Sequence, residues 1–278
     1  MAADRAVTAR PAAGRRRASF RLYGPLPALP YLAIAIAIFV LMFGAWWLAA
    51  RVHLASSFFL PSPSQVGHRV VQLARDGTLW QDTKISFTRI SIGWLISTAV
   101  GLPIGILIGT LRPFEAAFEP PIDFFRYMPA VAFVPLTIVW VGVGESQKYL
   151  IIFIGTFFQQ ALMVMDNVKR VPREYVDIGR TLGMRESSIL VRIVIPASAP
   201  ALWDTLRITI GWAWTWLVVA ELVAANSGLG HRIMTAERFF ETDTIFVGIL
   251  TIGVLGLVMD QVMKFVGRRL FHWSEKRR

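Results

Sequence analysis

The sequence predicts an all-α polytopic membrane protein with six transmembrane helices. Of its 278 residues, 55% are hydrophobic and only 17% are charged, whereas soluble domains carry about 25% charged residues. So many apolar side chains need an apolar solvent as well as an apolar core. The second observation is a series of apolar stretches long enough to cross the roughly 30 Å hydrocarbon core of a bilayer as helices. These two observations exclude an ordinary soluble domain.

The apolar stretches differ in clarity. The first is the clearest because it contains no charged residue, the third is interrupted by Pro129 and Pro135, and the fourth is short. Proline is tolerated in a membrane bundle because neighbouring helices re-satisfy the backbone groups that it frees. The six predicted spans are Leu29–Ala50, Ile85–Leu111, Ile122–Gly144, Tyr149–Met165, Leu202–Ala225 and Ile245–Val266.

Regularly spaced glycines mark two of these spans. Gly101, Gly105 and Gly109 are four residues apart, and Gly248 and Gly256 are eight apart. Small residues on one helix face let two helix backbones approach closely. Glycine is also common in membrane helices without such a role, so close packing is one of two interpretations.

The basic residues predict how the helices are oriented. The formal net charge of +11 could by itself indicate nucleic acid or anionic lipid as a partner. With both termini placed in the cytoplasm, the inner segments carry about three times as many Lys and Arg residues as the outer segments, as the positive-inside rule requires. The excess charge therefore reflects topology, and we expect no nucleic-acid partner.

The two ends of the chain predict tails. Residues 1–28 are rich in Ala, Arg and Pro without a hydrophobic period, which predicts a disordered basic cytoplasmic tail. Residues 29–266 form the six-helix transmembrane domain, and residues 267–278 form a basic cytoplasmic C-terminal tail. A cleaved signal peptide is the alternative, but the first apolar stretch exceeds the usual length of about 7–15 residues.

Two outer segments each predict a short helix after a turn. Proline, serine and glycine clusters mark the turns, and an amphipathic pattern follows each of them. The helices expected are Gln65–Arg75, with Pro63 or Ser64 at its cap, and Ile233–Phe240, which follows a turn at Asn226–Gly230.

The longest inner loop, Asn167–Ala201, predicts two short helices joined at a glycine. Tyr175, Ile178 and Leu182 recur at i, i+3 and i+7 and therefore lie on one helical face. Gly183 then breaks the helix or permits a left-handed turn. Further signals are Pro172 in the first turn, Ser187 or Ser188 as the cap of the second helix, and Pro196 as its stop.

Such a loop forms an amphipathic knob, with charges around an apolar stripe. An amphipathic helix beside positive charge suits docking into a groove on another protein. It equally suits lying on the surface of an anionic membrane. The residues alone leave both possibilities open.

No motif of catalysis or cofactor binding is present in the sequence. There is no G-x-x-x-x-G-K-[ST] phosphate-binding loop, no H-E-x-x-H and no G-x-S-x-G. The sequence contains no cysteine, and its four histidines are scattered outside the predicted spans without ligand spacing. We therefore expect no catalytic residue, no metal ligand and no cofactor bound by this chain.

The inner loop resembles the signature of permease subunits of bacterial ATP-binding-cassette (ABC) importers. In that family an acidic-Ala-Ala triplet is followed, after three intervening residues, by a glycine, and an Ile/Leu-Pro element comes later in the loop. Here Asp177-Ile178-Gly179 takes the triplet positions, Gly183 the glycine and Ile195-Pro196-Ala197 the closing element. Asp replaces Glu, and neither Ala is kept.

The resemblance extends from about Phe59 to Trp273 and indicates the nitrate/taurine/sulfonate branch of these importers. The segments that carry it lie in spans, turns and outer loops alike. They are Phe59–Pro63, Gly101–Gly105, Trp140–Glu145, Leu206–Ile208, Val219–Leu222, Ser227–Gly230 and Thr242-Asp243.

The resemblance implies a type I ABC importer permease fold in the bacterial inner membrane. The loop 167–201 would carry the coupling helix, which docks a cytoplasmic ATPase subunit that binds ATP and Mg²⁺. A second permease copy would complete a homodimer in the lipid bilayer, and a periplasmic or lipid-anchored solute-binding protein would deliver a small anion such as nitrate, a sulfonate or taurine. Nucleotide and loaded binding protein would bias a two-state assembly.

The resemblance assigns ATPase docking to the knob. Apolar Tyr175, Ile178, Leu182 and Met184 would enter the partner's groove, and arginines would supply charge at its rim. The expected docking residues are Glu174, Tyr175, Asp177, Ile178, Gly179, Arg180, Leu182, Gly183, Met184 and Arg185, with Arg173 as a further rim charge.

The sequence also predicts a substrate pathway and two charged pairs within the spans. Charged residues within spans are costly and are usually functional or paired. Arg207 can pair with Asp204, and Asp260 with Lys264, at helical spacing. Residues expected along the pathway are Arg126, Met128, Trp212, Trp216 and Glu221. For Glu221 and Arg207 a structural role, holding the bundle together, is the favoured alternative.

Two other functions were weighed. A secondary transporter without an ATPase partner would require inverted repeats and a paired ion site within the membrane, and neither is evident in the sequence. A membrane anchor or assembly factor would need neither kinked, glycine-rich spans nor a structured inner loop.

Overall fold

The computed structural model describes residues 27–274, and within this range all regular secondary structure is helical. The predicted N-terminal tail, residues 1–28, lies outside the described residues except for its last two positions. Residues 275–278 of the predicted C-terminal tail lie outside them as well.

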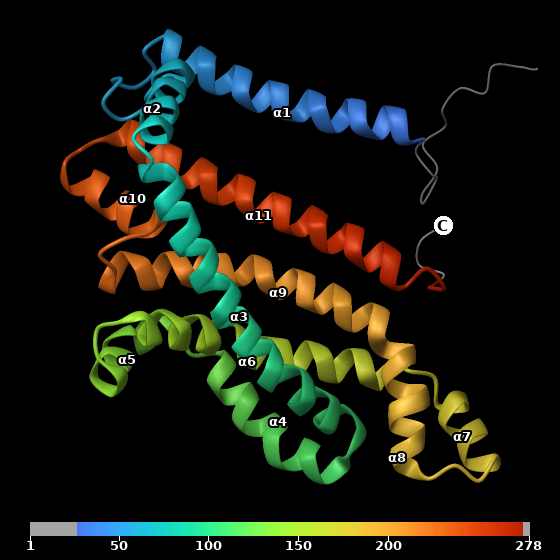
Figure 1. Cartoon of the computed structure of the whole chain (residues 1–278). Helices are drawn as coiled ribbons and strands as arrows, with labels where there is room; N and C mark the ends of the chain where they lie inside the picture. The colour runs from blue at the N-terminus through green and yellow to red at the C-terminus, as the bar shows by residue number, and fades with distance from the viewer. Residues whose placement is uncertain (1–26, 275–278) are drawn as a thin grey trace, which may run out of the picture.

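Five helices are long and apolar enough to cross a membrane, which confirms five of the six predicted spans. In the view of Figure 1, α1, α6, α9 and α11 run in similar directions, and α3 is tilted relative to them while it packs along α6. The five are α1 (Ala28–Arg51), α3 (Thr78–Thr110), α6 (Glu145–Lys169), α9 (Ile195–Ala224) and α11 (Thr242–Leu270).

The third predicted span, Ile122–Gly144, is wrong as a single helix. Its residues belong to α4 (Arg112–Arg126), a 3-10 turn, η1 (Ala130–Phe133), and α5 (Val134–Val141), and the two halves are bent by 91°. The break falls at Pro129, whose backbone is extended and which lacks the N–H that a continuing helix needs. The segment is a broken span or a re-entrant loop.

The two outer helices form, with shifted starts. α2 (Pro63–Arg75) is capped by Ser62 rather than by Pro63 or Ser64. The Ser62 hydroxyl accepts from the backbone N–H of Gln65, and the side-chain oxygen of Gln65 accepts from the backbone N–H of Ser62. The second helix, α10 (Leu229–Arg238), begins four residues earlier than predicted.

The inner loop contains the two predicted short helices, α7 (Arg173–Thr181) and α8 (Glu186–Ile189). Pro172 is the N-cap of α7, one position before the first turn in which it was predicted. Arg185, not a serine, occupies the cap of α8, and no side chain caps this helix. Pro196 does not stop the helix: a π-helical turn, η2 (Leu190–Val194), continues into α9. The wider turn accommodates the proline ring, which in an α-helix would clash with the carbonyl four residues earlier.

The core is the contact between α3 and α6, and it depends on glycine. A Cβ at Gly105 would lie 2.5 Å from the carbonyl oxygen of Ala161 and 2.6 Å from Cβ of Val164. A Cβ at Gly109 would lie 2.9 Å from the Met165 carbonyl oxygen. These distances confirm close packing along the glycine face of α3, because only glycine leaves room for the α6 backbone.

We predict that Gly105→Ala lowers the free energy of unfolding by about 1–3 kcal/mol, since the added methyl group forces two packed backbones apart. Gly253→Ala is the matched control, because a Cβ at Gly253 meets nothing within 4 Å and alanine favours the helix. Thermal unfolding of the purified protein in detergent would measure both variants. Equal transition temperatures for Gly105→Ala and Gly253→Ala would contradict the packing argument.

Candidate functional site

Helix α7 presents an exposed apolar stripe at the end of the bundle. Tyr175, Ile178 and Leu182 are 49%, 57% and 73% exposed, although each is apolar. At about 3.6 residues per turn they share one face, as predicted. Exposed apolar side chains that cluster in this way commonly mark a contact surface.

The other sides of α7 are fixed to the bundle. Gly179 is buried, and a Cβ there would lie 2.9 Å from Cδ1 of Ile193 and 3.0 Å from Cγ1 of Ile189. Val176 and Met184 pack into the same cluster. Met184 is therefore turned inward, and its predicted place in the exposed stripe is wrong.

A Schellman turn ends the helix at Gly183, whose φ of 71° confirms the predicted left-handed glycine. The backbone N–H of Gly183 donates to the carbonyl of Arg180 at 2.9 Å, and that of Met184 donates to the carbonyl of Gly179 at 3.0 Å. The glycine thus reverses the chain and lets Met184 reach the core.

Arg180 stabilises the knob from within. Its guanidinium donates to the Glu186 carboxylate at 2.8 Å and lies 3.6 Å from that of Asp177. The hydrogen bond to Glu186, reinforced by attraction to both carboxylates, raises the pKa of Arg180 above its ordinary value. Arg180 thus forms an internal pair across the turn, whereas Arg185 is exposed and forms no ion pair with a described residue.

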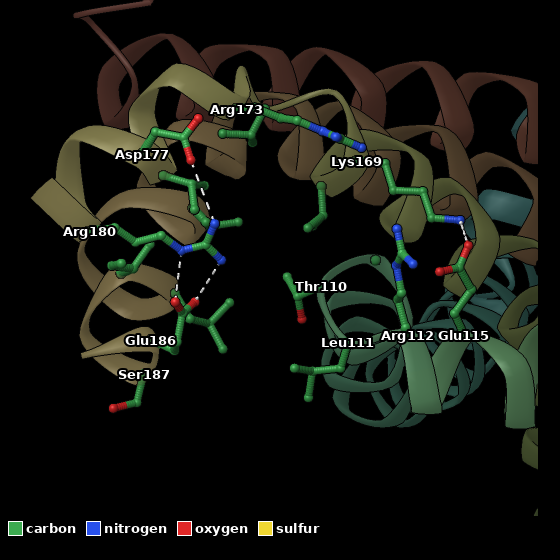
Figure 2. A pocket seen from close by; sticks show the side chains of 17 residues that line it. Thr110, Leu111, Arg112, Glu115, Lys169, Arg173, Asp177, Arg180, Glu186 and Ser187 are labelled. Carbon is green, nitrogen blue, oxygen red and sulfur yellow. Dashed lines mark hydrogen bonds and ion pairs between the residues drawn. The ribbon is translucent and has the colours of Figure 1, made fainter. Parts of the chain in front are cut away.

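A cavity of about 970 Å³ lies behind α7 (Figure 2). Arg173, Val176, Asp177 and Arg180 line it at i, i+3, i+4 and i+7 of α7, and this face is opposite the exposed stripe. The far wall comes from the end of α3, the start of α4 and the end of α6. Helix α7 therefore has one face that carries the exposed stripe and another that borders a cavity open to solvent.

The five predicted pathway residues are not gathered into one site. Arg126 lies 2.9 Å from Asp123 and stacks on the ring of Tyr127. Met128 is half-buried in the break between α4 and η1, and Trp212 is 38% exposed. Trp216 packs on α6, where a Cβ at Gly155 would collide with its ring, and Glu221 is fully buried.

Glu221 belongs to a buried ionic network, as the structural role favoured for it requires, although its partner Arg89 was not predicted from the sequence. Arg89, only 3% exposed, donates to Glu221 at 2.9 Å and to Glu145 at 2.6 Å. The Glu221 carboxylate also accepts from the Ser86 hydroxyl and from the backbone N–H of Gly230, both at 2.8 Å. One arginine thereby joins α3, α6 and α9.

The network extends to α10 through a second pair. The Asp82 carboxylate accepts from Arg232 at 2.8 Å and from the backbone N–H of Gly228 at 3.0 Å. Buried charges persist only when paired and hydrogen-bonded. The sequence contained a signal for this network. In the predicted topology, Arg89, Glu145 and Glu221 each lie in or next to a span at its outer end.

A second ionic cluster lies toward the other end of α9. Arg207 lies 3.4 Å from Asp260 and 4.0 Å from Asp204, and Asp260 lies 2.7 Å from Lys264. Both predicted helical pairs are confirmed, and the Arg207–Asp260 contact additionally links α9 to α11. Among residues 27–274, no group of three or more His, Asp or Glu side chains could hold a metal ion.

The sequence comparison decides the family. Residues 101–272 match the model of the binding-protein-dependent transport system inner membrane component. The chain belongs to this family. Family membership makes it a membrane-spanning transport permease rather than a catalytic subunit, and it decides against a secondary transporter or a simple anchor.

Relatives span nearly the whole permease. A probable ABC transporter permease of Brucella abortus is 36% identical over 88% of this chain and 97% of its own length. The taurine transport system permease TauC of Escherichia coli is 31% identical over 92% of this chain and 94% of its own length. A putative aliphatic sulfonates transport permease, SsuC of Bacillus subtilis, is 31% identical over 93% of this chain and 91% of its own length.

Solved structures share the fold. A chain of the inward-facing MetNI methionine ABC transporter superposes with a TM-score of 0.56 at 21% identity, over 66% of the permease and 90% of that chain. A chain of an amino acid ABC transporter gives 0.58 at 13% identity, over 72% and 97%. The predicted type I ABC importer permease fold is therefore confirmed.

We predict that Arg89→Met lowers the free energy of unfolding by about 3–5 kcal/mol, because it leaves the buried Glu221 carboxylate without its counter-charge. Adding Glu221→Gln should recover part of the loss, since the amide is neutral and still offers an acceptor to Gly230. The control is Arg69→Met, which breaks the more exposed pair with Glu241 and should cost about 1 kcal/mol or less. Unfolding in detergent would compare the variants, and a loss at Arg89 no larger than at Arg69 would contradict the role of the network.

Proposed function

We propose that this permease is the membrane subunit of an ATP-driven importer and that α7 is its coupling helix. The observation that carries the proposal is the exposed stripe of Tyr175, Ile178 and Leu182, which projects beyond the spans on a helix anchored to the core. The stripe suits the groove of a cytoplasmic ATPase, where apolar anchors supply affinity. ATP and Mg²⁺ bind to that partner and not to this chain.

The connection from α7 to the bundle supports transmission of movement. From Glu186 to Ala224 the chain is one continuous helical segment of 39 residues, through α8, η2 and α9. Its far part carries Glu221, which is bonded to Arg89 of α3. A displacement of the knob by the ATPase therefore reaches the opposite end of the bundle through a rigid element, as a switch between two packed states requires.

The topology follows from the same assignment. The start of α1, the end of α11 and α7 lie at one end of the bundle, and α2 and α10 lie at the other (Figure 1). The basic inner segments place the first end in the cytoplasm. Both termini are then cytoplasmic, the protein spans the bacterial inner membrane, and the network around Arg89 faces the side from which a solute-binding protein delivers substrate.

A second permease copy completes the membrane channel in this proposal. Val139, Trp140 and Val143, at the end of α5 and beyond it, are 79%, 59% and 69% exposed. Such apolar side chains need either lipid or another helix bundle as a neighbour. We expect a homodimer in the bilayer.

The substrate that we propose for this importer is a small anion. TauC and SsuC are named for taurine and aliphatic sulfonates, which share a sulfonate group, and nitrate has a comparable charge and oxygen arrangement. Arg126, Met128, Trp212 and Trp216 remain our proposed contacts along the pathway. Full uptake of dilute labelled taurine by an Arg126→Ala importer, assembled with its binding protein, would remove Arg126 from that pathway.

We predict that Leu182→Asp reduces ATPase copurification at least tenfold, because a charge placed in an apolar groove must be desolvated without a partner. The matched control is Phe239→Asp, since Leu182 is 73% exposed and Phe239, near the opposite end of the bundle, is 72% exposed. Unchanged copurification with Leu182→Asp would refute the docking assignment.

We predict that Gly183→Pro leaves membrane insertion intact but abolishes transport-coupled ATP hydrolysis. Proline cannot adopt the φ of 71° at this position and removes the N–H that donates to Arg180. Hydrolysis stimulated by loaded binding protein in proteoliposomes would measure the effect. Wild-type stimulation in this variant would show that the turn does not shape the coupling surface.

A further inference from the structure

The cavity behind α7 has an apolar wall and a charged rim. Its apolar wall comes from the ends of α3, α6 and α8 and from η2, and its rim comes from the starts of α4, α7 and α8 together with the end of α6. The wall residues include Gly109, Val168, Ile189, Leu190 and Val194. A space of this form matches a molecule with one charged and one apolar part.

The acidic residues of the rim are already neutralised. The Glu115 carboxylate accepts from Lys169 at 2.7 Å. Asp177 and Glu186 share the guanidinium of Arg180, at 3.6 Å and 2.8 Å. These carboxylates therefore do not repel a further anion as free charges would.

Two arginines of the rim, Arg112 and Arg173, have no acidic partner within ion-pair distance among the described residues. Within residues 27–274, neither Arg112 nor Arg173 forms an ion pair or a side-chain hydrogen bond, yet both line the cavity. Figure 2 shows their side chains extending toward the same part of the cavity, beside the Lys169–Glu115 pair. Lys169 is paired with Glu115 and Glu119. The four basic side chains that line the cavity outnumber the three acidic ones, and the surplus positive charge lies at Arg112 and Arg173.

The positions of the two arginines are unfavourable for the fold alone. Arg112 is the first residue of α4 and Arg173 is the first residue of α7, and no side chain caps either helix. A positive charge at a helix N-terminus opposes the helix dipole, and the free N–H groups there favour an anion. An anion between the two helix starts would satisfy both arginines and both dipoles.

We propose that this cavity binds the phosphate group of an anionic phospholipid from the cytoplasmic leaflet. Arg112 and Arg173 hold the phosphate oxygens, and the apolar wall receives the first part of the acyl chains. The inference rests on the proposed topology, which places the cavity at the inner membrane surface. The bound lipid would brace α7 from the face opposite the docking stripe.

The test uses the full-length permease in a neutral detergent and three probes: short-chain phosphatidylglycerol, short-chain phosphatidylcholine and inorganic phosphate. Native mass spectrometry and the shift in unfolding temperature report binding. We expect phosphatidylglycerol to bind more tightly than the other two probes. In the Arg112→Gln/Arg173→Gln variant its affinity should fall at least about tenfold, the loss expected for two charge-assisted hydrogen bonds.

The matched control is Arg268→Gln/Arg269→Gln, which removes two exposed positive charges at the end of α11, outside the cavity. This variant should bind phosphatidylglycerol as the wild type does, and Arg112→Lys/Arg173→Lys should retain part of the affinity. Equal losses in the two glutamine variants would overturn the proposal, because the charge would then act only as a diffuse surface field.

The remaining outcomes distinguish the lipid site from a site for a soluble anion and from an ATPase interface. Tighter binding of inorganic phosphate than of phosphatidylglycerol would assign the site to a soluble anion and overturn the lipid assignment. ATPase copurification, measured in parallel, separates the two proposals. Arginine-dependent lipid binding without ATPase docking would overturn the coupling role of α7 and support the lipid site. Loss of docking in the glutamine variant, with no lipid bound by the wild type, would assign the arginines to the ATPase interface and overturn the lipid site.

Discussion

The close approach of α3 to α6 is the constraint on which the rest of the structure depends. Gly105 and Gly109 leave no space for even a methyl group between the two backbones. Because the helices meet along their length, the start of α6 brings Glu145 to Arg89, and its end brings Lys169 to Glu115. The close packing at the glycines near the end of α3 thus helps to fix which charges meet at both ends of the bundle.

Charged side chains are arranged differently at the two ends of the bundle. At the end with α10, Arg89 and Glu221 are buried and fully engaged, so the helices are held by a network that tolerates little rearrangement of one member alone. At the end with α7, charges border a cavity and an apolar stripe stays exposed. Helix α9 connects the two regions, so that one end of the bundle is held by buried ion pairs and the other has an exposed apolar stripe.

Much of this architecture could be predicted from the sequence. Apolar length gave five spans, and the i, i+3, i+7 pattern with Gly183 gave both the exposed stripe and its terminating turn. The remainder depends on tertiary contacts. The inward turn of Met184 follows from the Schellman geometry, and pairing of Arg89 with Glu145 and Glu221 joins residues far apart in the chain. The bend at Pro129 and the helix running through Pro196 show that a proline's effect depends on the turn before it.

The π-helical turn at Leu190–Val194 has a consequence for how docking surface and bundle are matched. Each residue of an α-helix turns the chain by about 100°. Shortening this turn by one residue would therefore rotate α7 and α8 by about that angle relative to α9 and would break the contacts of Val176 and Met184 with the bundle. The length of the irregular turn thus fixes the direction in which the exposed stripe of α7 points relative to the membrane-spanning helices.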